Sequence, residues 1–149
     1  MAMTLQEISD RMEIQDLLVR YSHCIDTRDW DGLDDVFTPD AFIDYTALGG
    51  SKGTLPETKE FLGKSMVLFK SFQHMISNLV VDLDGDRATA RCICHNPMVL
   101  DRNGAEHVFV CGLWYVDRLV RTEAGWRIAE RIEERCYIDN MPEDFRPPS

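Results

Sequence analysis

Two ionisable residues that lie far apart in the chain, Asp26 and His74, form the combination that most strongly suggests chemistry. An imidazole that donates one N–H to a carboxylate keeps its other nitrogen as a base, an arrangement that serves proton abstraction. Asp26 is expected at the end of a long helix, and His74 lies in an apolar strand. We therefore predict a pocket that brings the two together. The alternatives are a solvated aspartate at a helix end and a histidine with a purely structural role.

Two tyrosines could complete such a site. Tyr21 precedes Asp26 by five residues, about 140° around an ideal helix, so both reach one cavity only if it is broad or the last turn unwinds. Tyr45 follows Ile43 on the first expected strand, where its hydroxyl could donate a hydrogen bond to a substrate carbonyl. A position at the edge of the core is an equally good interpretation of Tyr45.

Four further residues are candidates for substrate contacts, namely Trp30, Asn78, His95 and Phe109. Strand alternation places Asn78 on the same face as His74, together with Phe72, Ile76 and Val80. His95 and Asn96 face opposite sides of their strand, so at most one of them lines a cavity. For the two aromatic residues, a place in the core is the favoured interpretation.

The elements that must position these residues begin with helices. Thr4 and Glu7 form a capping box, and apolar residues then recur near a 3.6 period, which predicts a helix to about Asp26. A short helix is expected over residues 30–37, a strand over 41–46 and a glycine-rich loop or lid over 48–53. Thr54 caps a further helix, with Pro56 in its first turn.

From residue 72 the apolar period changes to two, which predicts strands over residues 72–83, 87–100, 107–120 and 125–137 with turn signals between them. Helices first and strands last indicate an α+β fold. We expect a cone-shaped α+β barrel, with the N-terminal helices packed in a strongly curved antiparallel sheet and a cavity on its concave side.

Two stretches of the C-terminal half have no part in this predicted site. Residues 127–136 alternate charges densely, which indicates a solvated sheet face or, less often, a salt-bridged subunit contact. Residues 141–149 are expected to be irregular.

Composition narrows the class of protein. The 149 residues suggest one domain over residues 1–149, and the net charge of −10 argues against nucleic-acid and anionic-membrane partners. The N-terminus has no signal-peptide pattern, and no apolar stretch approaches the ~20 residues of a spanning helix. Five cysteines without CxxC spacing favour reduced thiols in a cytoplasmic protein, with no zinc site. No motif for a metal or cofactor is present, so cofactor-independent chemistry is expected.

The residues also resemble a known family. Four segments carry the likeness, namely Tyr21 with Asp26-Thr-Arg-Asp-Trp-Asp-Gly-Leu33, Phe42-Ile-Asp-Tyr45, Gln73-His74, and Gly125-Trp126-Arg-Ile. They resemble the SnoaL-like branch of the nuclear-transport-factor-two-like superfamily. Within it, the chain looks most similar to the group that holds scytalone dehydratase, bile-acid 7α-dehydratase and hexachlorocyclohexane dehydrochlorinase.

The resemblance implies a cone with a deep pocket that works without metal or cofactor. It implies an Asp–His pair, here Asp26 and His74, in which the histidine abstracts a proton and the aspartate orients it. Tyr21 and Tyr45 match tyrosines of the bile-acid and fungal enzymes, respectively. The fungal enzyme's tyrosine before its aspartate is Ile25 here, and its second histidine, serine and asparagine fall near Met98, Phe109 and Cys111. Relatives of this kind are trimers or dimers, so a homo-oligomer is expected.

Residues and resemblance together predict a cofactor-independent lyase of the dehydratase or dehydrohalogenase type. Its substrate would be a small, mostly apolar cyclic or aromatic molecule. An isomerase or polyketide-type cyclase would use the same base without loss of a leaving group. A non-catalytic small-molecule or protein-binding module of the same fold is the alternative from a different class.

Overall fold

The computed structural model describes residues 2–145, and its two α-helices begin where the capping boxes predict. Helix α1 (Leu5–Asp26) is capped by Thr4, whose hydroxyl accepts the Glu7 N–H at 3.1 Å. Helix α2 (Leu55–Ser65) is capped by Thr54 in the same way. The short helix expected over residues 30–37 is only a 3₁₀ helix over Asp31–Asp35, and the first strand already starts at Phe37.

Seven strands form one sheet in the order β2-β1-β7-β6-β5-β3, and β4 also pairs with β5. The strands are β1 (Phe37–Asp44), β2 (Lys52–Thr54), β3 (Ser71–Phe72), β4 (Met75–Asp84), β5 (Arg87–Arg102), β6 (Ala105–Thr122) and β7 (Gly125–Asp139). All pairs are antiparallel except β1 with β7, which is parallel. A parallel pair needs a long connection, which α2 and the β3–β6 segment supply here.

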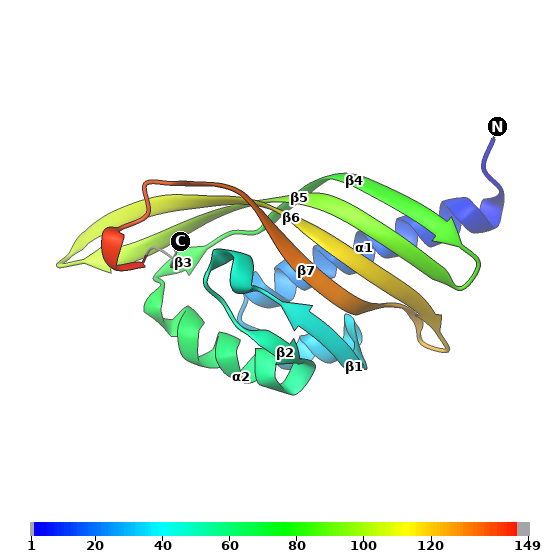
Figure 1. Cartoon of the computed structure of the whole chain (residues 1–149), viewed down its shortest axis with the longest axis horizontal. Coiled ribbons are helices and arrows are strands. Elements are labelled where there is room, and N and C mark those ends of the chain that lie inside the picture. The colour runs from blue at the N-terminus through cyan, green and yellow to red at the C-terminus, as the bar shows by residue number, and fades with distance from the viewer. Residues whose placement is uncertain (1, 146–149) are drawn as a thin grey trace.

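The predicted α+β architecture is confirmed, with a strongly curved sheet that does not close into a barrel. The long strands β4–β7 curve over α1, while α2 lies on β1 and β2 (Figure 1). The apolar face of α1 supplies Ile14, Leu18 and Ile25 to the core between helix and sheet, and each of them is fully buried. The helix therefore fills one end of the concave face, and its last turn reaches the middle of the fold.

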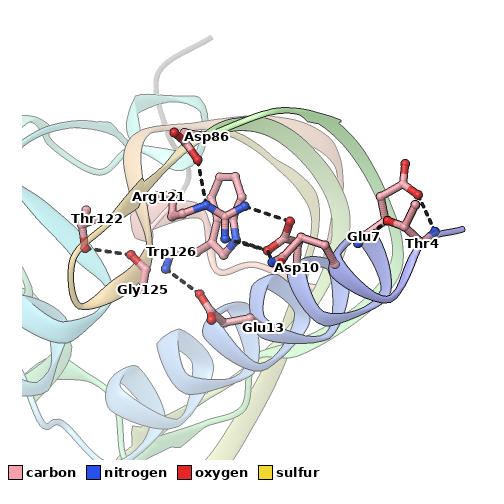
Figure 2. A network of polar contacts seen from close by, with 10 residues as sticks. Thr4, Glu7, Asp10, Glu13, Asp86, Arg121, Thr122, Gly125 and Trp126 are labelled. Carbon is pink, nitrogen blue, oxygen red and sulfur yellow. Dashed lines mark hydrogen bonds and ion pairs between the residues drawn. The ribbon is translucent and has the colours of Figure 1, made fainter.

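A polar network holds the other end of α1 against the β6–β7 hairpin (Figure 2). The buried Asp10 carboxylate accepts two hydrogen bonds from Arg121, at 2.8 and 2.9 Å, and one from the Trp126 indole at 3.1 Å. Glu13, one turn further along, accepts the Trp126 backbone N–H at 2.6 Å. These contacts set the direction of α1 along the sheet and so the place of its C-terminal residue, Asp26.

A bulge in β4 overturns one sequence-based assignment. The register with β5 shifts between Ser77 and Val80, where Asn78 has a left-handed φ of 51°. One extra residue in a strand inverts the faces of the side chains beyond it. As a result Asn78 and Val80 are exposed and Val81 is buried, so Asn78 does not share the inner face with His74.

A second bulge, in β7, corrects the interpretation of the charged segment 127–136. The register with β6 moves from Leu119–Ile128 to Arg118–Glu130, which leaves Ala129 as the extra residue. Trp126 and Ile128 point inward before the bulge, and Arg131 does so after it, with no exposed surface. The segment is therefore a solvated face only in part, because it also places charged side chains inside the protein.

Four of the five cysteines are buried and Cys136 is exposed, and all five are free thiols. Of the tail expected to be irregular, Glu143–Phe145 forms a 3₁₀ helix and residues 146–149 lie outside the described residues. Among residues 2–145, no helix combines the length and apolar character that a membrane crossing requires.

Candidate active site

Asp26 and His74 are in direct contact. The His74 Nδ1–H donates to Asp26 Oδ1 at 2.7 Å, and the His74 backbone N–H donates to Asp26 Oδ2 at 3.0 Å. We place the proton on Nδ1 because an ionised carboxylate can only accept. The two bonds fix the position of the ring, and in the neutral imidazole they place the proton on Nδ1, so that Nε2 is the nitrogen that can act as a base. The side chain of His74 is 8% exposed and that of Asp26 is 27% exposed.

Two local features of the backbone create this contact. Asp26 is the last residue of helix α1. The chain turns away directly after it, where Arg28 adopts a left-handed φ of 58°. His74 lies in the gap between β3 and β4, where its backbone N–H is free to donate to a side chain. Asn96 on β5 supports the gap by donating to the Gln73 carbonyl at 2.7 Å.

The predicted tyrosines also meet. Tyr21 and Tyr45 are both buried, and their hydroxyls are 2.6 Å apart. Burial raises the pKa of Tyr21 to about 12 and that of Tyr45 well above its usual value, although the positive charge of Arg131 opposes both shifts. Both hydroxyls are therefore protonated at neutral pH. Because only one proton is needed between the two oxygens, the other remains available for a ligand.

The guanidinium of Arg131 lies against the rings of Tyr21 and Tyr115. It is 4.1 Å from the ring centroid of Tyr21 and 3.9 Å from that of Tyr115. Two hydrogen bonds of 2.8 Å join it to the Asp117 carboxylate, and neither of these charged side chains has any exposed surface. Two hydrogen bonds to Asp117 offset much of the positive charge of Arg131. The guanidinium also lies over the faces of Tyr21 and Tyr115, where cation–π attraction stabilises it.

These groups border a cavity of about 300 Å³. Its polar wall contains His74, Tyr21, Tyr45, Asn96 and Glu133, and most of the remaining wall is apolar. The apolar part comes from α1, α2 with the segment after it, the segment after β1, the strands β5 and β6, and the C-terminal turn. It includes Ile25, Leu48, Phe61, Leu62, Met66, Phe69, Met98, Phe109, Met141 and Phe145. A small apolar molecule of one or two rings fits a space of this size and character.

The structure divides the predicted site residues into two groups. Asp26 and His74 form the pair, and Tyr21, Tyr45, His74 and Phe109 line the cavity. Trp30, Asn78 and His95 are not among the lining residues. His95 alternates to the outer face of β5, where its ring is 3.4 Å from the Tyr137 hydroxyl, so Asn96 rather than His95 faces the cavity.

Glu133 is a cavity residue that the sequence interpretation missed. It follows the inward-facing Arg131 by two residues on β7, which puts both on the same face of the strand. Burial raises the pKa of Glu133 to about 8, and Asp44 adds to the shift while Arg131 opposes it. Alternation continued from Trp126 and Ile128 would place Glu133 outside. No glycine or asparagine marks the bulge at Ala129.

No group of three or more His, Cys, Asp or Glu side chains within residues 2–145 is arranged so that it could hold a metal ion.

The curved, open sheet packed on two helices has the nuclear-transport-factor-two-like fold. The chain belongs to the SnoaL-like domain family, whose sequence model matches residues 6–132. The uncharacterized protein Rv2910c of Mycobacterium tuberculosis is 51% identical over 139 residues, which is 93% of this chain and 94% of the relative.

Two solved structures illustrate the range of the fold. A provisionally named scytalone dehydratase from Novosphingobium aromaticivorans has a TM-score of 0.82 and 18% identity, with 94% of this chain and 93% of the other covered. A type 2 hexachlorocyclohexane dehydrochlorinase, LinA, has a TM-score of 0.78 and 18% identity, with 93% of each chain covered. At such identities these similarities establish the shared fold.

Proposed function

We propose that the protein is a cofactor-independent lyase that eliminates a β-leaving group from a small, mostly apolar cyclic or aromatic substrate. Nε2 of His74, with the ring held by Asp26, removes a proton from a carbon next to a carbonyl. The observation that carries this proposal is the doubly hydrogen-bonded Asp26–His74 pair, of which His74 lines a cavity of about 300 Å³. A positioned general base of this kind typically accelerates proton transfer by about 10²–10⁴-fold.

The tyrosine pair supports the same chemistry. Removal of a proton next to a carbonyl develops negative charge on the carbonyl oxygen, and donors placed in a largely apolar site stabilise that charge. The raised pKa values of Tyr21 and Tyr45 keep both hydroxyls protonated, and their shared hydrogen bond leaves one proton free for the substrate. Dehydrochlorination, the activity in the name of one structural relative, is itself an elimination.

The test compares His74→Ala and Asp26→Asn with the wild-type protein on aryl and cyclic ketones that carry a hydroxyl, aryloxy or halide group in the β position. We expect both variants to lose about 10²-fold or more in kcat/KM, with a Tm within a few degrees of the wild-type value. His95→Ala is the matched control, because it removes the same side chain from the outer face of β5. Product formation is followed by absorbance and mass spectrometry.

Two results would contradict this function. Undiminished turnover in His74→Ala would show that the imidazole is not the base. Wild-type protein that binds these ketones in calorimetry without converting them would favour the alternative of a small-molecule binding module, which the mostly apolar cavity would equally serve.

A further inference from the structure

The elimination proposed above assigns no role to Glu133, although this side chain lines the same cavity as His74. Its Oε2 atom is inaccessible to solvent and has no hydrogen-bond partner. A buried carboxylate without a partner is unfavourable, whereas a protonated carboxyl group can remain in such a place until a ligand accepts its hydrogen. Because Oε2 has no accessible surface, a substrate in the cavity would meet the carboxyl group of Glu133 through Oε1.

The charged neighbours of Glu133 do not neutralise it. Arg131 on the same strand attracts the carboxylate, but its Nε and Nη2 atoms donate to Asp117, and its buried Nη1 atom forms no hydrogen bond with Glu133 or any other group among the described residues. Asp44 at the end of β1 repels a negative charge on Glu133. The other titratable groups whose charges interact with Glu133 are Tyr21, Tyr45, Tyr115, Cys94 and Cys111, and each of them is buried and protonated at neutral pH because its pKa is raised.

We propose that Glu133 holds a proton in the resting protein and donates it to an oxygen leaving group, so that the substrate is a β-hydroxy carbonyl compound and the reaction is a dehydration. This assignment rests on the proposed elimination and narrows it. Hydroxide is a poor leaving group that departs readily only when it is protonated, while a halide leaves as a stable anion. A cavity that offers both a base and a protonated carboxyl group is suited to the oxygen case.

The step balances without a co-reactant. The α-carbon proton passes to Nε2 of His74, and the electron pair of that C–H bond forms the carbon–carbon double bond. The carbon–oxygen bond breaks with its electron pair on oxygen, which takes the Glu133 proton, so that water leaves. The site then holds an imidazolium and a carboxylate. Transfer of one proton from His74 to Glu133 through solvent restores the starting state.

The experiment uses two probes that differ only in the leaving group, a β-hydroxy aryl ketone and the corresponding ketone with a β-nitrophenoxy group. Nitrophenolate needs no proton to depart. For Glu133→Gln we expect kcat to fall by about 10²-fold or more for the hydroxy ketone. The loss for the nitrophenoxy ketone should be at least tenfold smaller. Glu134→Gln is the matched control, because the next residue of β7 is exposed and pairs with Arg91 outside the cavity.

A second readout needs no substrate. Infrared difference spectra of wild type minus Glu133→Gln should contain the band of a protonated carboxyl group at neutral pH, and the band should disappear as the pH rises through about 8. A carboxyl group that is already ionised at about pH 6, well above the ordinary pKa of a glutamate, would overturn the assignment.

The outcomes separate the two proposals. If His74→Ala abolishes both reactions and Glu133→Gln leaves both intact, or reduces both equally, the elimination stands and the role of Glu133 is wrong. If the wild type converts the nitrophenoxy ketone but not the hydroxy ketone, the elimination also stands and the role of Glu133 is wrong. If the wild type converts neither probe, or His74→Ala converts both, the elimination itself is contradicted.

Discussion

Charged residues in and around the cavity differ in whether their charge has a partner. Arg131 is held by Asp117 through two hydrogen bonds, and Asp26 accepts two from His74. The Oε2 atom of Glu133 has none. Because an unpaired buried charge is unfavourable, Glu133 favours its neutral form, whereas each of the other two pairs is joined by two hydrogen bonds.

This difference predicts a pH effect on stability. Folded Glu133 keeps its proton up to about pH 8, whereas the ordinary value is 4.5. Between these values the folded state binds more protons than the unfolded state, so the contribution of Glu133 to the free energy of unfolding is full below pH 4.5 and is lost as the pH rises through 8. Because one proton is involved, the slope is at most about 1.4 kcal/mol per pH unit.

Urea unfolding at a series of pH values measures this slope. Glu133→Gln should be more stable relative to the wild type at pH 8 than at pH 5, whereas Glu134→Gln should follow the wild type at both. An identical slope in all three proteins would mean that Glu133 titrates as an exposed glutamate does.

At the level of elements, two bulges and one polar network decide what faces the cavity. The bulges at Asn78 and Ala129 invert the alternation of β4 and β7, which removes Asn78 from the inner face and brings Glu133 to it. The network around Asp10 holds the N-terminal half of α1 on the β6–β7 hairpin (Figure 2) and thereby directs Asp26 toward His74.

The network predicts a loss of stability in Asp10→Ala. The variant leaves the Trp126 indole N–H and two donors of Arg121 without their acceptor, and hydrogen bonds to a charged group are worth roughly 1.5–3 kcal/mol each in favourable cases. Partial exposure of Arg121 reduces this sum, so we expect a loss of about 2–3 kcal/mol in urea unfolding.

Asp86→Ala is the control for this prediction, because it removes an exposed carboxylate from the same guanidinium. Surface ion pairs contribute little, so its effect should be clearly smaller. Equal losses in the two variants would show that the buried hydrogen bonds of Asp10 do not stabilise the helix–hairpin contact.

On the scale of the whole molecule, the cavity is closed by segments from both ends of the chain. Phe145, in the C-terminal 3₁₀ helix, lines it opposite residues of α1 and α2 and lies 6.0 Å from Phe69, centroid to centroid. Arg102 at the end of β5 holds this turn, because its guanidinium donates to Asp144 at 2.9 Å and stacks over Phe145 at 5.1 Å. The C-terminal turn is thus a wall of the cavity that Arg102 and Phe69 hold in place.

Arg102→Ala should therefore weaken ligand binding without removing any catalytic group. We expect KM for a ketone probe to rise severalfold while kcat changes little, which is the pattern of lost uniform binding. Lys70→Ala is the control, because Lys70 forms a comparable ion pair with Glu106 that does not contact the turn. A fall in kcat with unchanged KM would contradict this role of the turn.

The chain's local signals were sufficient for much of the fold. Two capping boxes located both helices, a change of period from 3.6 to two located the long strands, and residue types together with the family resemblance singled out Asp26 and His74. These features depend on contacts between residues near in sequence, or on a pair of residues whose chemistry is recognisable wherever the fold places them.

The tertiary structure alone decided which side chains enter the cavity. Asn78 lies outside the cavity and Glu133 lines it because one extra residue in a strand inverts the side chains beyond it. The register that creates each bulge is set by pairing with another strand. The assembled sheet also decided that Asn96, and not His95, faces the cavity. It likewise brought Arg131 and Asp117, which lie on two different strands, into one buried ion pair.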